Sequence, residues 1–452
     1  MVLVKPILKI LMLIQVAIGV IVLCSPLALL AIHGKPEPYE GRGFSEFPDM
    51  ASVFYDSSAG RNTAADALLE RMVIRKWAIS ARNWFTLHIL GYADTKQVVS
   101  GGDGFLFTRK AFDQFSCDSN PADARELESL NLTMALAEGS NSALLLAVIP
   151  NKASVHPELV VGRAVHYARC YAEHAELLRR SAKQASRGAM VDHLPSIQSV
   201  KSRTGYGYNR GDTHWMPHME LAVLQDLYLA ITGLDPRLAD LPVQPGKIKR
   251  SGDLERMLLI AREYPTIESD RKALDGALGD LEKIPGKTVV LYDSFYKSKR
   301  ESIARLFVET SFFHMNSASD AIAGEGKYAG SFHAAMRDAD QIIVGIAERN
   351  VISRLRSLNE YLLGEMLDRN TQHAGRACDW RQAPEELMNR TQPLEPASYP
   401  GQTKSRAISV NIENPSATKT HNTCIQLIVG SSVASPPQLL FRRPDGSVLD
   451  SV

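Results

Sequence analysis

A serine, a histidine and an aspartate occupy two short stretches of this sequence. The stretch GDTHWMPH, residues 211 to 218, holds Asp212 and His214 two positions apart. Ser294 comes directly after the apolar run VVLY and Asp293. A serine hydroxyl is a weak nucleophile that needs a histidine base, and that histidine in turn needs a carboxylate to orient it. These residue types therefore predict nucleophilic catalysis, with Ser294 as nucleophile, His214 as base and Asp212 as orienting group.

Two plainer interpretations of the same residues compete with catalysis. As a metal site, Asp212 and His214 lack a clear third ligand, because the other ligand types in the chain do not form an HExxH-like frame; those considered are His218, Glu220 and His314. An Asp-x-His turn is also unremarkable in a chain with 12 histidines, and Asp293 or Ser294 could simply cap a helix. We expect no metal.

The flanking residues predict where the two stretches lie. The glycine- and tyrosine-rich TGYGYNR, residues 204 to 210, is typical of a loop, and HMELAVLQDLYLAITG after the motif has helical spacing and ends at Gly233. Ser294 follows an apolar strand and precedes a helix, where backbone N–H groups can stabilise an oxyanion. Asp212 and His214 are therefore expected in a loop that leads into a helix.

Apolar strands alternate with helices along the middle of the chain. We expect strands in residues 141–152, 188–194, 286–294 and 339–349, and helices in 63–90, 122–138, 165–185 and the segment KSKRESIARLFVE. Two short strands are predicted about the Gly-Asp-Gly turn in residues 97–109. This order predicts an α/β fold with a parallel sheet flanked by helices, and chemistry at the carboxyl ends of its strands.

The first residues form the strongest compositional signal. No residue from Ile10 to Ile32 is charged, and this run is long enough to cross a bilayer of about 30 Å as a helix. Lys5 and Lys9 precede it, so the positive-inside tendency leaves them in the cytoplasm. The alternative is a cleaved signal peptide, but that needs a shorter apolar core and a small-x-small site. We prefer an uncleaved anchor.

The predicted divisions are a cytoplasmic stub and anchor, a linker, a catalytic domain and a β-rich C-terminal module or extension; they span residues 1–33, 34–62, 63–375 and 376–452. Outside the apolar run, four cysteines allow three disulfide connectivities. We prefer Cys117 with Cys170 and Cys378 with Cys424, with free buried thiols as the alternative. The formal charge of +1 gives no general attraction to nucleic acid.

Five stretches carry a resemblance to a known family. In order, GGDGFLF, VIPNKASVHPE, DTHWMPHM, YDSFY and IIVGIAER resemble the AlgJ/AlgX-type alginate O-acetyltransferases, which have an SGNH-hydrolase-like domain. The similarity runs from about Gly101 to about Arg349. It implies an enzyme that moves acetyl groups onto exopolysaccharide hydroxyls through an acetyl-serine intermediate. Further residues are expected to support the site: Lys152, Trp215, Tyr292, Asp293, Tyr296, Glu348 and Arg349.

The sequence also departs from the family pattern. Relatives usually have glycine before the Asp-Ser pair, where this chain has Tyr292, so the oxyanion hole cannot be copied; Asn209 and Asn316 are guesses for its donors.

The resemblance implies location and partners as well. We expect a single-pass protein of the bacterial inner membrane with its catalytic domain in the periplasm. We expect no cofactor, because a membrane-bound O-acyltransferase partner would supply the acetyl group, and the other partners would be polysaccharide export proteins. The alternatives are an acetylesterase with the same triad and a non-catalytic polysaccharide-binding or scaffold subunit.

Overall fold

The computed structural model describes most of the chain between residues 73 and 374. The described ranges are 73–120, 125–139 and 143–374, with the short segments 15–16, 46, 48–49, 62–64, 66–67, 70, 406–409, 424–427, 440–442 and 448–451. The predicted anchor in residues 10–32 lies almost wholly outside them. Among the described residues, no helix has the length and apolar character needed to span a bilayer. The predicted domain boundaries stay a prediction.

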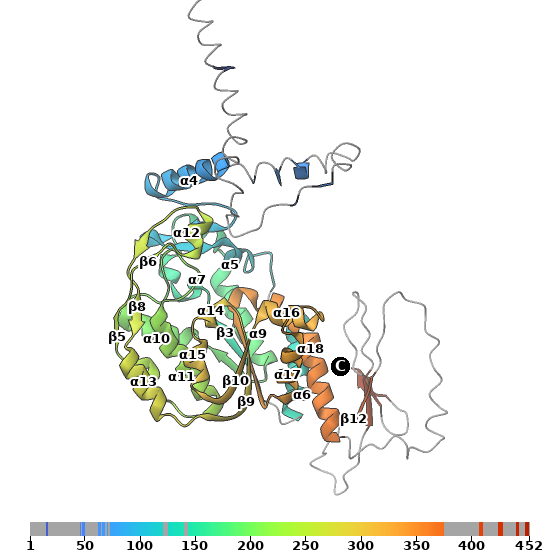
Figure 1. The fold of residues 1–452 in the computed structure, drawn as a ribbon. Coiled ribbons are helices and arrows are strands. Elements are labelled where there is room, and N and C mark those ends of the chain that lie inside the picture. The colour runs from blue at the N-terminus through green and yellow to red at the C-terminus, as the bar shows by residue number, and fades with distance from the viewer. Residues whose placement is uncertain are drawn as a thin grey trace, which may run out of the picture.

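A five-stranded parallel sheet forms the centre of the fold, as the alternation of strands and helices predicts (Figure 1). Its strand order is β10-β9-β11-β3-β4. The strands are β3 (Ala143–Ile149), β4 (Met190–Asp192), β9 (Ile284–Tyr292), β10 (Phe307–His314) and β11 (Gln341–Ala347). Since every pairing in this sheet is parallel, all carboxyl ends meet at one edge.

One predicted helix is partly wrong. The segment KSKRESIARLFVE was expected to be helical throughout, but α14 (Ser294–Lys297) and α15 (Arg300–Ala304) are followed by edge strand β10. The strand residues VETSFF are β-branched or aromatic at four of six positions, which suits a strand better than a helix. Phe307 pairs with Ile284, and His314 with Tyr292.

The helix predicted over residues 165–185 is two helices. α8 (Arg163–Tyr167) and α9 (Tyr171–Ala185) are separated at Cys170. Cys170 forms a disulfide with Cys117, with Cα atoms 5.1 Å apart, so this predicted pairing is confirmed. The predicted Cys378 to Cys424 pair lies outside the residues whose side chains are described.

The other described helices lie around the sheet or at one end of it. They are α4 (Val73–His88), α5 (Arg109–Asp113), α6 (Arg125–Gly139), α7 (Lys152–Val155), α10 (Leu194–Thr204), α11 (Glu220–Thr232), α12 (Asp253–Met257), α13 (Arg271–Asp280), α16 (Met315–Ile322), α17 (Ala329–Asp338) and α18 (Val351–Ala374). Gly233 ends α11 in the left-handed region with φ 74°, as predicted from the sequence.

Small antiparallel pairs complete the described elements. β1 (Val98–Ser100) pairs with β2 (Leu106–Thr108) about the Gly-Asp-Gly turn, as expected. The remaining pairs are β5 (Val243–Pro245) with β8 (Ile267–Ser269), β6 (Lys249–Arg250) with β7 (Glu263–Tyr264), β12 (Arg406–Ser409) with β13 (Cys424–Leu427), and β14 (Leu440–Arg442) with β15 (Val448–Ser451).

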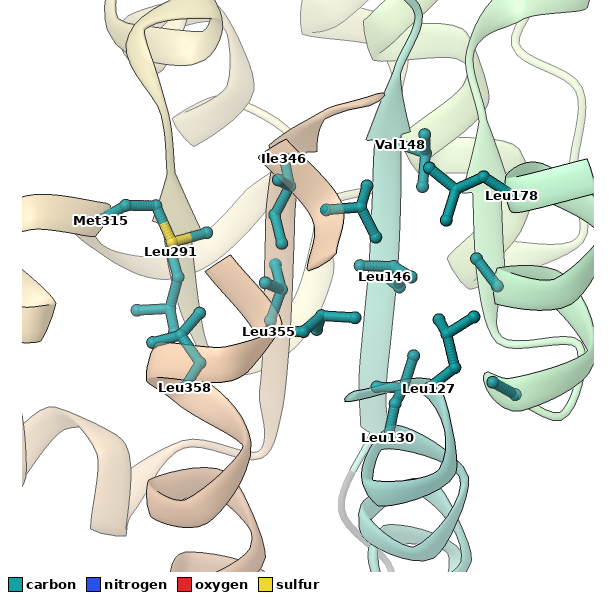
Figure 2. Packing of buried hydrophobic residues seen from close by; sticks show 14 of the residues in the cluster. Leu127, Leu130, Leu146, Val148, Leu178, Leu291, Met315, Ile346, Leu355 and Leu358 are labelled. Atoms are coloured by element: carbon teal, nitrogen blue, oxygen red, sulfur yellow. The ribbon is translucent and has the colours of Figure 1, made fainter. Parts of the chain in front are cut away.

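Helices cover both faces of the sheet, because its strands are apolar on both sides. On one face, Leu146, Leu291 and Ile346 pack against α6, α9, α16 and α18 (Figure 2). On the other face, Val290 and Ile343 belong to a second buried cluster with residues of α10, α11 and α13. The buried strands therefore hold the carboxyl edge in place from two sides.

Candidate active site

Asp293 shapes the turn that presents Ser294. Its Oδ1 accepts a hydrogen bond from Phe295 N at 2.9 Å, and its Oδ2 accepts one from Ala347 N at 2.7 Å. Burial raises the pKa of this carboxyl, although the two N–H donors oppose that effect. Asp293 is thus the helix cap, and it joins the end of β9 to the end of β11. Ser294 begins α14 and leaves its own side chain exposed.

The structure brings Ser294, His214 and Asp212 into one hydrogen-bonded chain. His214 Nε2 lies 2.9 Å from Ser294 Oγ, and His214 Nδ1 lies 2.7 Å from Asp212 Oδ1. Because a carboxylate accepts at Nδ1, the imidazole carries its proton there and Nε2 can accept from the serine hydroxyl. The Asp212 side chain is 3% exposed and that of His214 is 31% exposed. The reacting end of the chain therefore faces solvent, and its anchoring end does not.

Asp212 is held as a carboxylate by the charges around it. Burial favours the neutral acid, but the hydrogen bond and charge of His214 and the ammonium of Lys249 outweigh it and hold the pKa of Asp212 well below its usual range. Lys249 on β6 binds Asp212 Oδ2. Asp212 Oδ1 also accepts from His214 N at 2.9 Å. Lys249 lies 37 residues beyond the motif, and no sequence signal linked it to the site.

A second carboxylate, Asp253 at the start of α12, lies behind the histidine. It accepts hydrogen bonds from Thr213 N, at 2.6 Å, and from Thr213 Oγ1. Its Oδ2 is 3.7 Å from His214 Nδ1. Burial and the nearby charge of Asp212 raise the pKa of Asp253. Asp253 therefore holds the loop through Thr213, a role that the sequence analysis missed.

Asp212, His214 and Asp253 could also reach a single metal ion, since one ligand atom from each lies within 4.8 Å of the others. The same atoms, however, already bond within the protein: Lys249 binds one oxygen of Asp212 and Ser294 bonds His214. This pattern favours acid–base chemistry. The other ligands considered in the sequence bond elsewhere: His218 to Thr204, Glu220 to Ser269, and His314 to the start of α16.

Lys152 is buried under the motif. Its Nζ donates to the carbonyl oxygens of Leu106 at 2.8 Å, Arg210 at 2.8 Å and Asp212 at 3.0 Å. Burial lowers the pKa of Lys152 to about 7, while the carboxylates of Asp212 and Asp253 oppose this effect. Three carbonyl acceptors need three N–H donors, which only the ammonium form provides. Lys152 thus joins β2 to the backbone of the DTHW loop.

Aromatic residues predicted to support the site pack behind it. The Trp215 ring is 4% exposed and lies 5.2 Å from the Phe295 ring and 6.3 Å from the Tyr296 ring. Tyr292 is buried at the end of β9, against His314. Tyr296 is also buried and bonds through its hydroxyl to His193. These side chains fix the positions of the loop and the turn without reaching the Ser294 hydroxyl.

The guesses for oxyanion donors find other partners. Asn209 Nδ2 donates to the carbonyl oxygen of Trp215 at 3.2 Å, so this amide holds the loop. Asn316 Oδ1 accepts from Arg354 at 2.8 Å. α14 has four residues, so its helix dipole contributes little at Ser294.

A small pocket opens beside the motif. Its lining residues are Phe107, Thr108, Ala111, Asn151, Lys152, Ala153, Thr213 and Arg349. Asn151 Oδ1 accepts from Arg349 Nη1 at 3.0 Å, which leaves Asn151 Nδ2 buried and without a partner among the described residues. Arg349 also lies over the Phe295 ring, 5.4 Å from its centroid. Because Thr213 lines the pocket, the pocket lies beside the loop that carries His214.

Arg349, which lines this pocket, interacts electrostatically with Lys110, which also interacts with Arg354. Burial and the charges of Arg349 and Arg354 lower the pKa of Lys110 on α5. In the described part of the chain, no carboxylate lies within ion-pair distance of these three cations. Three neighbouring cations that form no ion pair favour a negatively charged ligand.

Part of the chain is similar to a known protein family. Residues 98–275 match the family model described as "SGNH hydrolase-like domain, acetyltransferase AlgX". This match spans less than half of the chain, so it shows what the segment is similar to. The predicted resemblance and enzyme class are thereby confirmed. The match includes Asp212 and His214 and ends before Ser294. No curated protein matches the chain significantly in sequence.

Three solved structures are similar to part of the chain. The O-acetyltransferase domain of Pseudomonas putida AlgJ is 16% identical, covers 59% of this chain and 99% of its own, and has a TM-score of 0.37. Pseudomonas aeruginosa AlgX is 13% identical over 57% and 67%, with a TM-score of 0.35. Bacillus cereus PatB1, with a sulfonyl adduct, is 12% identical over 57% and 96%, with a TM-score of 0.36. Because these TM-scores are low, the fold assignment rests on the sheet and the family match.

Proposed function

We propose that this protein transfers acetyl groups to hydroxyls of a secreted, alginate-like exopolysaccharide through an acetyl-serine intermediate on Ser294. The observation that carries the proposal is the hydrogen-bonded chain from the exposed Ser294 hydroxyl through His214 to the buried Asp212. The family match supports the acetyl group as the cargo. The alginate-like acceptor is proposed from the resemblance of the five sequence stretches to the alginate O-acetyltransferases.

The first half of the reaction loads the serine. Ser294 Oγ attacks the carbonyl carbon of an acetyl ester while its proton passes to His214 Nε2. Asp212 stabilises the imidazolium that forms, because its carboxylate bonds Nδ1. When the tetrahedral intermediate collapses, the ester bond of the donor breaks and His214 returns the proton to the leaving oxygen. The acetyl group then remains on Ser294.

The second half reverses these steps with a sugar hydroxyl. The hydroxyl gives its proton to His214 Nε2 and attacks the acetyl carbon, and the bond to Ser294 Oγ breaks. His214 then returns the proton to the serine. The neighbouring cations Lys110, Arg349 and Arg354 support an acceptor with negative charge. The protein needs no cofactor for either half.

The acetyl donor and the location belong to the same proposal. The apolar residues 10–32 would anchor the chain in the inner membrane with Lys5 and Lys9 in the cytoplasm. The disulfide between Cys117 and Cys170 is in keeping with an oxidising periplasm. A membrane-bound O-acyltransferase would then deliver the acetyl group to Ser294, and polysaccharide export proteins would present the acceptor.

The test compares transfer with hydrolysis. The purified full chain is given a chromogenic acetyl ester with and without a panel of neutral and uronic-acid oligosaccharides, and Ser294→Ala is the control. We expect acetylated oligosaccharide, with the uronic acids preferred. Hydrolysis with no acetylated sugar would favour the acetylesterase alternative. No serine-dependent reaction at all would favour the scaffold alternative.

A further inference from the structure

Helix α4 exposes large apolar side chains on one face. Trp77 is 72% exposed, Trp84 51% and Phe85 50%, and they are followed by Ile89 at 58% and Leu90 at 51%. Trp77 and Trp84 are seven residues apart, so they lie on the same side of the helix. Exposed apolar residues in such a group mark an interaction surface, whereas scattered ones need no explanation.

Another side of α4 touches the protein and carries polar groups. Ser80 Oγ donates to Leu259 O at 2.7 Å, and Asn83 Nδ2 donates to Leu258 O at 2.9 Å. Leu87 adds an apolar contact with a small cluster that includes Leu254 and Leu258. The side of α4 that contacts the protein is therefore mixed in character, whereas its large aromatic side chains point outward, unlike the usual amphipathic pattern of a surface helix. Figure 1 shows α4 at one end of the molecule, beside α12.

The charges on α4 are all of one sign. The helix carries Arg75, Lys76 and Arg82 and no acidic residue. At 3.6 residues per turn, the exposed face runs from Trp84 to Phe85, and Lys76 and Arg82 lie beyond its two edges. Long basic side chains beside an apolar face can reach lipid phosphates while the aromatic rings enter the bilayer interface.

We infer that α4 lies in the surface of a membrane that contains anionic lipids, with Trp77, Trp84 and Phe85 immersed in the interface. Trp and Phe on one face with basic residues on the flanks are typical of interfacial helices. Membrane contact by α4 would also position the site, because α12, to which it bonds, begins with Asp253, the partner of Thr213. The inference rests on the proposed membrane attachment and on no step of the catalysis.

Tryptophan fluorescence can test this inference in the full chain. The protein has four tryptophans: Trp77, Trp84, Trp215 and Trp380. The predicted anchor contains none, and Trp215 is buried, so quenching by lipid reports chiefly on α4. The chain is reconstituted into vesicles of phosphatidylcholine and phosphatidylglycerol, with either ordinary or brominated acyl chains. We expect brominated lipid to reduce the fluorescence by roughly a third to a half, because two of the four tryptophans would be in contact with lipid.

Matched variants separate α4 from the other tryptophans. Trp77→Phe with Trp84→Phe keeps the apolar face and should remove most of the quenching, whereas Trp380→Phe should preserve it. Lys76→Gln with Arg82→Gln, or vesicles of phosphatidylcholine alone, should weaken the quenching.

Vesicle-bound protein without quenching would overturn the inference and favour a protein partner for this face. Quenching that survives in the double Phe variant would overturn it too. Protein that does not float with vesicles would contradict both the anchor and α4 contact.

Discussion

Two hydroxyl–histidine–aspartate chains lie among the described residues, and only one of these two is open to solvent. In the first, Ser294 bonds His214 Nε2, and His214 Nδ1 bonds Asp212. In the second, the Tyr296 hydroxyl bonds His193 Nε2 at 2.6 Å, and His193 Nδ1 bonds Asp226 at 2.8 Å. Both chains use the same two ring nitrogens in the same order.

The two hydrogen-bonded chains differ in how far they are buried. The second is sealed, with the side chain of His193 fully buried and Tyr296 0% exposed. Burial raises the pKa of Tyr296 well above its ordinary value, so the phenol stays neutral. Tyr296 also fills the space over Gly345, where even a Cβ atom would come within 2.6 Å of its ring. A shared hydrogen-bond pattern therefore does not define an active site; exposure of the hydroxyl does.

Replacing the exposed hydroxyl should have the largest effect. Ser294→Ala removes the nucleophile, and we expect kcat to fall by at least about 10⁴-fold. The thermal unfolding temperature should stay nearly unchanged, because the Ser294 side chain is exposed. Ester hydrolysis and differential scanning fluorimetry measure the two quantities. Full activity in this variant would rule out the nucleophile.

Substitutions of Asp212 and Asp226 should affect kcat to different extents. Asp212→Asn leaves His214 without its carboxylate, and we expect kcat to fall by about 10³- to 10⁴-fold with a smaller change in KM. Asp226→Asn in the sealed chain should change kcat by less than about tenfold. Steady-state kinetics of both variants make the comparison. Equal losses of kcat would mean that the sealed chain takes part in catalysis.

Tyr296→Phe should lower the free energy of unfolding. It removes the hydroxyl that bonds buried His193, and an unsatisfied buried nitrogen costs about 1 to 3 kcal/mol. We expect unfolding at lower denaturant concentration while kcat stays within about threefold. Urea unfolding followed by circular dichroism checks the first, and initial rates check the second. A variant as stable as the parent protein would show that this bond contributes nothing.

A smaller loss of folding stability should appear as the pH falls. Burial lowers the pKa of His156 and of His218 to about 4, below the ordinary value near 6.5. Between pH 4 and 6.5 the unfolded chain binds more protons than the folded one, so stability should fall as the pH falls through this range. The expected loss at pH 5 is roughly 2 kcal/mol for each histidine.

His156→Gln tests this pH dependence. Gly207 N donates to His156 Nε2 at 3.1 Å, and glutamine keeps a neutral acceptor there. Melting temperatures from pH 7.5 to 4.5 should depend less on pH in the variant than in the parent protein. A parent protein whose melting temperature does not change over this range would contradict the buried neutral state of these histidines.

Features set by neighbouring residues could be predicted from the sequence, whereas contacts between residues far apart in the chain could not. The strand-to-helix turn at Ser294, the loop that carries DTHW and the stop at Gly233 follow from neighbouring residues. Lys249 and Asp253 reach the loop from 37 and 41 residues beyond Asp212, and only the folded packing of β6 and α12 brings them there. The helix expected through Glu309 failed because pairing with β9 makes that segment an edge strand.

The most direct test of the account is to trap the acetyl group on the protein. The full chain is mixed briefly with an acetyl ester, quenched in acid, and examined by intact mass and peptide mapping. The account predicts one acetyl group on Ser294, its absence in Ser294→Ala, and its loss when an acceptor oligosaccharide is added before the quench. An acetyl group on another residue, or one that persists in Ser294→Ala, would contradict it.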